Sequence, residues 1–268
     1  MALHQRANAG DSEAVAFTAV VAALGVGEPP SWWRALERLR RAAKLGSTFA
    51  EEQVAVLESS GLIGPPKPVV EQRLSADPQI CSLPDFLPVP ACDWLIGRAA
   101  GRTRQAETYD SQTGQRRVDP RRDNSVLGFT FKDFDLVMVA VRARIAAAVG
   151  APVDRLEPAQ VLHYAPGQQF DRHHDFLDPD VAGYAVELAA RGQRVATFLI
   201  YLNAGFEGGA TEFPVVGVTY KGRPGDGLRF ANVDPAGKPD PRTLHAGLPP
   251  LSGEKWLFSQ WIRDRTAI

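Results

Sequence analysis

Four of the five histidines in this 268-residue chain lie between residues 163 and 245, and one of them, His173, stands two residues before Asp175. In extended backbone, side chains two residues apart face the same side, so His173 and Asp175 can bind one ion together. His245 is the candidate third ligand. Two histidines and one carboxylate on one face of an octahedral metal leave three positions open, which an iron(II) oxygenase needs for a bidentate cosubstrate and dioxygen. The same donors also suit a cupin-type zinc hydrolase or isomerase.

The other two histidines of this region are expected to be structural. His174 alternates with the two candidate ligands and should point away from the metal, and His163, between Leu162 and Tyr164, lies on the opposite face of its strand. An isolated His-x-Asp is most often part of a solvated turn, so the metal assignment depends on the surrounding sequence.

The elements that must position these residues are mainly short strands. The sequence predicts strands at 159–164, 195–202, 228–232 and 255–262. Glycine-rich turns such as 206–209 separate them, and helices are predicted around 91–99 and 134–149. Many short strands without intervening helices favour a sandwich or barrel over a parallel α/β sheet.

The chain changes character near residue 65. Residues 1–62 are rich in Ala, Leu, Glu and Arg with helical spacing, whereas Gly, Pro, Val and aromatic residues dominate afterwards. Pro65, Pro66 and Pro68 mark the join, because proline cannot continue a helix and stiffens a linker. We therefore predict an all-helical domain at 1–65, a linker at 66–79 and a strand-rich domain at 80–268.

The helical part also repeats itself at an offset of 36 residues: Ala7, Gly10, Ala14 and Gly25 recur as Ala43, Gly46, Ala50 and Gly61. This period resembles tetratricopeptide-like helix-turn-helix repeats, which implies a surface for a protein partner. The alternative is a helical cap that only packs on the next domain.

Composition narrows the class of protein. A formal net charge of −1 gives no argument for nucleic-acid binding. The two cysteines, Cys81 and Cys92, show no metal-binding spacing and predict buried thiols in a reducing compartment, so the cytoplasm is expected. The apolar stretch at 14–27 is too short to span a membrane and is predicted to be a helix, with a secretory signal as the alternative.

Three ordered blocks of sequence surround the candidate metal ligands. The first reads Glu157-x-x-Gln160-x-x-x-Tyr164-x-x-Gly167-Gln168-x-x-x-x-His173-x-Asp175. The second reads Arg194-x-x-Thr197-x-x-x-Tyr201-Leu202-Asn203, followed by Gly208-Gly209-x-Thr211-x-Phe213-Pro214. The third reads Leu244-His245-Ala246-Gly247-x-Pro249, Gly253-x-Lys255-Trp256 and Gln260-Trp261-Ile262-Arg263. From about residue 83 to residue 262, the chain resembles the prolyl 4-hydroxylase branch of the iron(II)- and 2-oxoglutarate-dependent oxygenases.

The resemblance implies a role for individual residues. It assigns His173, Asp175 and His245 to iron, and Lys255 to the distal carboxylate of 2-oxoglutarate, a buried dianion that needs a fixed positive partner. Tyr164 and Thr211 match family positions whose hydroxyl groups help to hold the same carboxylate. A core tyrosine and a turn threonine are the alternative readings of these two residues.

Two further positions match the substrate side of the family. Arg194 corresponds to a residue near the peptide substrate and Trp261 to one near the iron, although an arginine before a strand is often simply solvated. Residues 101–122 carry six arginines against three acids, and this segment is either a mobile solvated loop or a lid that closes over a longer ligand. The chain departs from the family at Phe170, where the family usually has tyrosine, which puts proline as the target residue in doubt.

These observations together predict an α+β protein: a double-stranded β-helix, or jelly roll, with flanking helices, preceded by a small all-α domain. The expected activity is an Fe(II)/2-oxoglutarate-dependent dioxygenase that hydroxylates a peptidyl residue, with proline favoured, and releases succinate and CO2. The cofactors are Fe(2+), 2-oxoglutarate and O2, with ascorbate as reductant. The expected partners are a peptide or protein substrate, and neither a membrane nor nucleic acid. Hydroxylation of another side chain or of a free amino acid, and a non-catalytic scaffold, are the alternatives.

Overall fold

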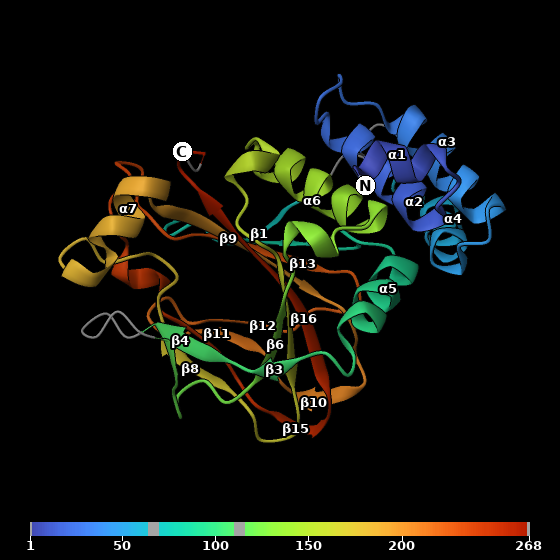
Figure 1. Cartoon of the computed structure of the whole chain (residues 1–268). Coiled ribbons are helices and arrows are strands. Elements are labelled where there is room, and N and C mark those ends of the chain that lie inside the picture. Colours follow the sequence, from blue (N-terminus) through green and yellow to red (C-terminus); the bar gives the residue numbers. More distant parts are fainter. Residues whose placement is uncertain (1, 64–69, 110–115, 267–268) are drawn as a thin grey trace. The chain divides into compact units, whose positions relative to one another are not determined.

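The computed structural model describes residues 2–63, 70–109 and 116–266 (Figure 1). They form two compact units. One comprises the described residues of Met1–Pro68 and Thr130–Val149, and the other those of Val69–Phe129 and Gly150–Ile268. The helix predicted at 134–149 thus belongs to the same unit as the N-terminal helices. The prolines that mark the predicted join lie outside the described residues, and the domain boundaries drawn from the sequence stay a prediction.

The first unit is all-helical. Helix α2 packs against α1, α3 and α6, and α4 packs against α3 and α6. The side-chain oxygen Oε1 of Gln53 accepts a hydrogen bond from the backbone N–H of Leu136 at 2.8 Å, which ties α4 to the first residue of α6. The helices are α1 (Leu3–Asn8), α2 (Ser12–Leu24), α3 (Trp32–Lys44), α4 (Thr48–Ser60) and α6 (Leu136–Val149).

The 36-residue offset has a structural counterpart in α2 and α4. Both helices have 13 residues, and their first residues, Ser12 and Thr48, are 36 positions apart. Each follows a side-chain N-cap and ends at a glycine in the left-handed region, Gly25 and Gly61, where only glycine avoids a steric penalty. The preceding helices differ, since α1 has 6 residues and α3 has 13. The tetratricopeptide-like class of this region stays a prediction.

The described part of the chain has no helix with the length and apolar character needed to cross a bilayer. The apolar stretch at 14–27 forms most of α2, as predicted, and Cys81 and Cys92 are free, buried thiols.

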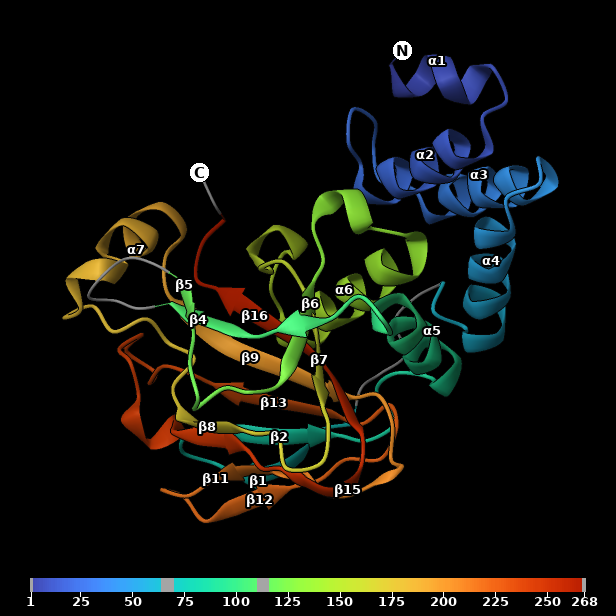
Figure 2. The same ribbon diagram turned by 60° about the horizontal axis from the view of Figure 1, so that its bottom comes forward.

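The second unit is built on two antiparallel sheets (Figure 2). The larger has the order β1-β2-β13-β9-β16-β7-β6-β3, with β1 (Gln72–Ser75), β2 (Ile80–Leu83), β13 (Gly227–Ala231), β9 (Arg194–Tyr201), β16 (Lys255–Arg263), β7 (Gln160–Tyr164), β6 (Ser125–Gly128) and β3 (Arg104–Gln105). The smaller has the order β12-β11-β14-β8, with β12 (Val218–Tyr220), β11 (Thr211–Phe213), β14 (His245–Gly247) and β8 (Phe170–His173).

Two short strand pairs and two helices complete this unit. The pairs are β10 (Phe206–Gly208) with β15 (Pro250–Gly253), and β4 (Glu107–Tyr109) with β5 (Arg116–Val118). The helices are α5 (Val89–Ala99) and α7 (Ala185–Arg191). The chain therefore mixes helices and sheets, as the sequence predicts.

The four predicted strands are confirmed, and they supply the centre of the larger sheet as β7, β9, β13 and β16. Their apolar residues are buried because removing apolar surface from water is the main favourable contribution to folding. One core cluster joins Leu199 of β9 and Phe230 of β13 to Phe213 of β11, so it links the two sheets. The candidate ligands His173 and His245 lie on β8 and β14 of the smaller sheet.

Two segments differ from the prediction. Gln72–Ser75, inside the predicted linker, forms β1 and pairs with β2. Phe206–Gly208, at the predicted turn 206–209, forms β10 and pairs with β15. The turn comes at the end of this segment, because Gly208 and Gly209 both have a φ of +66° and a Cβ at Gly208 would lie 2.9 Å from the carbonyl oxygen of Pro249.

Candidate active site

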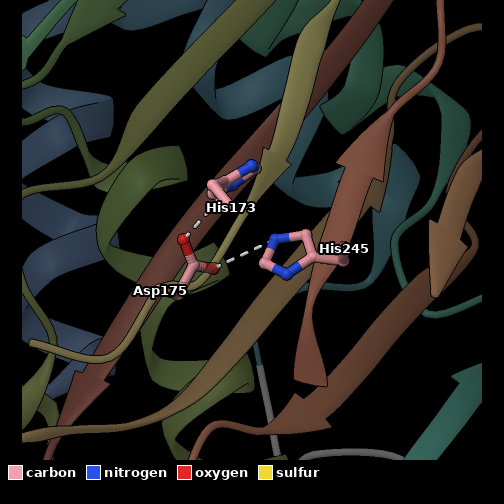
Figure 3. Close-up of side chains that lie close together, drawn as sticks. All are labelled: His173, Asp175 and His245. Carbon is pink, nitrogen blue, oxygen red and sulfur yellow. Dashed lines mark ion pairs between the residues drawn. The ribbon is translucent and has the colours of Figure 1, made fainter. Parts of the chain in front are cut away.

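His173, Asp175 and His245 come together in the folded chain (Figure 3). β8 and β14 are neighbours, and His173 lies directly opposite His245 in their register. The Nε2 atoms of His173 and His245 lie 3.6 Å from Oδ1 and Oδ2 of Asp175, respectively. One ligand atom from each residue lies within 4.8 Å of the other two, which is close enough to hold a single metal ion.

Backbone hydrogen bonds orient both imidazole rings toward this point. Nδ1 of His173 lies 2.7 Å from the carbonyl oxygen of Asp171, and Nδ1 of His245 lies 3.0 Å from that of Thr243. A carbonyl oxygen only accepts, so each Nδ1 carries the hydrogen and each Nε2 keeps its lone pair. Burial lowers the pKa of both histidines, and the proximity of His245 lowers that of His173 further. Both rings are therefore neutral and able to bind a metal.

Asp175 is a buried carboxylate. Burial by itself would raise the pKa of Asp175, but the neighbouring His245 and His173 and the hydroxyl of Thr197 lower it below the usual value. Thr197 Oγ1 donates to Asp175 Oδ2 at 2.7 Å, and the side-chain amide of Asn232 donates to Thr197 Oγ1 at 3.0 Å. The carboxylate is thus ionised and held in one orientation.

The two remaining histidines have other partners. Nε2 of His174 lies 3.0 Å from the carbonyl oxygen of Pro241, and Nε2 of His163 lies 3.1 Å from a carboxylate oxygen of Glu254. Neither belongs to the group that can hold a metal.

A pocket opens beside the three candidate ligands. Its lining includes them and Tyr164, Thr211 and Trp261, which the sequence predicted for the site. Arg122 and Phe170 also line it.

Lys255, the first residue of β16, is fully buried and is not itself among the residues that line the pocket, but it lies against Tyr164, which is. Its Nζ lies 4.8 Å from the centroid of the Tyr164 ring and 5.5 Å from that of Tyr201, and it has no hydrogen-bond partner among the described residues. Burial and the charge of Lys221 lower the pKa of Lys255 to about 7. An unpaired buried ammonium is costly, so its presence beside a pocket indicates that the pocket receives an anion.

Thr211 is part of a chain of hydroxyl groups that the sequence did not reveal. The hydroxyl of Tyr201 lies 2.9 Å from Thr211 Oγ1 and donates to the carbonyl oxygen of Tyr220, also at 2.9 Å. Because Tyr201 has a single hydroxyl hydrogen, Thr211 must donate to Tyr201 in this arrangement. Tyr201 belongs to the second sequence block. Its position in that block was the one feature of the sequence that could have indicated a role near the site.

Arg194 does not face open solvent. Its guanidinium makes two hydrogen bonds to Glu157, at 2.7 and 3.1 Å, and lies 3.7 Å from the ring centroid of Trp261. Arg263 also pairs with Glu157, which is buried. Trp261 lines the pocket, and its indole Nε1 has no partner within the described chain. Arg194 thus supports the wall of the pocket from behind.

Phe170 stacks against one of the candidate ligands. Its ring and that of His173 are 3.4 Å apart between centroids and inclined by 10°, and the Arg122 guanidinium lies 4.5 Å above the Phe170 ring. Arg122 belongs to the arginine-rich segment 101–122, part of which lies outside the described residues. The described end of this segment is attached to β8, because the backbone N–H of Asp171 donates to the carbonyl oxygen of Arg121 at 2.7 Å.

Comparison with known proteins identifies the family to which the chain belongs. Residues 159–263 match the model of the 2OG-Fe(II) oxygenase superfamily. The chain is 33% identical over 217 residues to prolyl 4-hydroxylase 1 of Arabidopsis thaliana, a match that covers 76% of this chain and 74% of that protein. The chain belongs to the 2OG-Fe(II) oxygenase superfamily, in the group of the prolyl 4-hydroxylases. Prolyl 4-hydroxylase 13 of the same plant is 32% identical over 208 residues, which covers 72% of this chain and 74% of that protein.

A solved structure agrees with this membership. The viral collagen prolyl hydroxylase of Paramecium bursaria Chlorella virus 1, solved as its 2OG complex, is 29% identical, with a TM-score of 0.54. The match covers 70% of this chain and 96% of that one.

The enzyme is therefore an Fe(II)- and 2-oxoglutarate-dependent dioxygenase. Its residues fit these cofactors, because two neutral imidazoles and one carboxylate suit Fe(II) and the unpaired ammonium of Lys255 suits a carboxylate. Family membership favours the oxygenase over the zinc-enzyme and scaffold alternatives.

Proposed function

We propose that this enzyme hydroxylates proline residues in a peptide or protein, with iron held by His173, Asp175 and His245. The observation that carries the proposal is the contact of the buried, unpaired Lys255 with Tyr164, which lines one pocket together with these three residues. When bound, iron(II) and 2-oxoglutarate activate dioxygen for insertion into a C–H bond, with release of succinate and CO2.

The protein's own residues bind and orient the cosubstrate. Lys255 pairs with the distal carboxylate of 2-oxoglutarate, and Tyr164, opposite Lys255 in the register of β7 and β16, lies against the same group. Thr211 donates to that carboxylate only if its hydrogen turns away from Tyr201. The cosubstrate carboxylate thus competes with Tyr201 for the Thr211 hydroxyl.

The substrate side of the pocket is formed by Trp261, Phe170 and Arg122. We assign Arg194 a positioning role through Trp261, because its guanidinium is bound to Glu157 and stacked on the indole. Phe170 brings a ring without a hydroxyl to this wall, so the pocket is more apolar here than a tyrosine would make it.

Proline as the target is supported by the relatives, whose names describe them as prolyl 4-hydroxylases, and by the similarity to a collagen prolyl hydroxylase. We propose ascorbate as the reductant that keeps the iron in its ferrous state. The proposed fold of the second unit is the double-stranded β-helix, or jelly roll, supported by its two antiparallel sheets joined through a common core.

The remaining proposals concern partners and location. The helices α1–α4 are a candidate recognition surface for a protein partner, supported by the matched caps of α2 and α4 and by Trp33, whose side chain is exposed. The free, buried thiols of Cys81 and Cys92 support the cytoplasm as the location.

The test of the proposed function is mass spectrometry of proline-rich peptides incubated with the full chain, Fe(II), ascorbate and 2-oxoglutarate. We expect a product heavier by one oxygen atom, located on proline by fragmentation, and an equal amount of succinate. A control peptide with alanine in place of each proline should stay unmodified. Oxygen on a different residue, or on a free amino acid alone, would overturn the assignment of proline.

A further inference from the structure

The two carboxylate oxygens of Asp175 have different surroundings. Each oxygen lies 3.6 Å from Nε2 of one candidate ligand, Oδ1 from His173 and Oδ2 from His245, but Oδ2 also accepts the hydroxyl hydrogen of Thr197 at 2.7 Å. Thr197 in turn contacts the side-chain amide of Asn232 at 3.0 Å. Both are buried, with exposures of 1% and 0%.

The direction of each hydrogen bond in this chain is determined. An ionised carboxylate only accepts, so the single hydroxyl hydrogen of Thr197 goes to Asp175. The contact of 3.0 Å between Asn232 and Thr197 must then use an amide hydrogen of Asn232 and a lone pair of Thr197. The order is therefore Asn232 to Thr197 to Asp175, and a reversed amide would place two acceptors in contact.

The orientation of the Asn232 amide comes at a cost. Its Oδ1 is buried and has no hydrogen-bond partner among the described residues. Leaving a buried acceptor unpaired destabilises the folded state, so the orientation in which Asn232 donates to Thr197 is unfavourable for its own Oδ1.

Rigid backbone holds both residues. Thr197 lies inside β9, opposite Phe230 of β13 and Trp261 of β16. Asn232 follows β13 directly, its backbone N–H donates to the carbonyl oxygen of Val195 at 2.9 Å, and its own carbonyl oxygen accepts from Asp240 at 3.1 Å. The donor groups are thus fixed before any metal binds.

We propose that Thr197 and Asn232 are positioning residues that keep Asp175 a ligand through one oxygen, Oδ1, by occupying Oδ2. This inference rests on the proposed metal site. With one oxygen from Asp175 and two imidazoles, an octahedral iron keeps three positions, two for the keto acid and one for dioxygen. A carboxylate that bound through both oxygens would take one of them, and 2-oxoglutarate and dioxygen would then compete.

The test compares variants of the full-length protein that change one member of this hydrogen-bond network at a time. Thr197→Val removes the hydroxyl at nearly constant volume, whereas Thr197→Ser keeps it. Asn232→Leu replaces the whole amide, and with it the donor to Thr197, by an apolar group of similar size. Thr219→Val, on the exposed face of β12, is the matched control. The measurements are the Kd for Fe(II) by anaerobic titration and the visible absorption band of the Fe(II)·2-oxoglutarate complex.

We expect Thr197→Val to weaken Fe(II) binding by about 10- to 100-fold, the usual effect of removing a partner of a metal ligand, and to shift or weaken the band. Thr197→Ser and Thr219→Val should resemble the wild type, and Asn232→Leu should show a smaller loss than Thr197→Val. Wild-type Kd and an unchanged band in Thr197→Val would overturn the inference.

Two further outcomes are informative. If Thr197→Val does not fold, as judged by circular dichroism of the metal-free protein, Asn232→Leu decides, and its wild-type Kd and band would overturn the inference. If the wild-type protein itself binds no Fe(II) and gives no band, both the proposed function and this inference are contradicted.

Discussion

Lys255 and Tyr164 lie directly opposite each other on β16 and β7, and the ammonium of Lys255 lies 4.8 Å from the centroid of the Tyr164 ring. The aromatic ring is the nearest favourable electrostatic contact of a buried cation that lacks a hydrogen-bond partner among the described residues. A cation–π contact compensates only partly for lost hydration. The pair is consequently suited to bind a carboxylate that arrives from outside.

The first prediction concerns this clamp. Lys255→Ala should leave Fe(II) binding largely intact and raise the 2-oxoglutarate concentration needed for turnover, because losing one partner of a buried ion pair costs about 3–5 kcal/mol. Lys255→Arg should recover only part of the affinity, since a planar guanidinium differs in shape from an ammonium. Lys238→Ala, at an exposed lysine in the loop after β13, is the control. Wild-type behaviour of Lys255→Ala at limiting 2-oxoglutarate would place the clamp elsewhere.

The second prediction is a pH dependence of cosubstrate binding. The pKa of Lys255 is lowered to about 7 in the protein without ligand, whereas the dianion requires the protonated amine. Affinity for 2-oxoglutarate should therefore be maximal below pH 7 and fall as the pH rises through this value, with proton uptake on binding above it. Calorimetry in buffers of different ionisation enthalpy measures this uptake. Binding without proton uptake at pH 8 would show that Lys255 is already charged in the free enzyme.

The third prediction concerns the wall of the pocket. Arg194→Ala removes an ion-pair partner of the buried Glu157 and the support of Trp261. We expect lower stability in urea unfolding and a larger loss in peptide turnover than in peptide-independent decarboxylation of 2-oxoglutarate. Arg41→Ala, at an exposed arginine of α3, is the control. Equal losses in both activities would contradict a role on the substrate side.

The fourth prediction concerns the stacked ring beside the iron ligand. Phe170→Tyr keeps the stack on His173 and adds a hydroxyl, so Fe(II) affinity should be unchanged while peptide turnover changes. Phe170→Leu removes the stack and should weaken Fe(II) binding several-fold. Anaerobic titration with Fe(II) provides the comparison. If Phe170→Leu binds iron as tightly as Phe170→Tyr, the stack does not position His173.

The sequence predicted β7, β9, β13 and β16 because each combines β-branched, aromatic and other apolar residues within a short segment. The strands β8, β10, β11, β12 and β14 have only three or four residues, several of them polar, and exist because their neighbours pair with them. No local pattern shows such pairing. For the same reason β1 was predicted as linker.

The sequence predicted those parts of the candidate site whose residues lie close together in the chain. His173 and Asp175 converge as their two-residue separation predicts, although β8 ends at His173. The partners of Asp175 and Arg194 were not predicted, because Asp175 and Thr197 are 22 residues apart and Glu157 and Arg194 are 37 apart. Hydrogen bonds across such separations follow from sheet register, which the sequence alone does not define.

The fifth prediction tests the central claim, that His173, Asp175 and His245 hold iron(II) for 2-oxoglutarate. Anaerobic wild-type protein should bind one Fe(II), and adding 2-oxoglutarate should produce the visible charge-transfer band that requires chelation by the keto acid. His173→Ala and His245→Ala should lose the band and turnover, whereas His174→Ala, whose imidazole contacts the carbonyl oxygen of Pro241, should keep most of both. Tight zinc binding without the band, or equal losses in all three variants, would contradict the account.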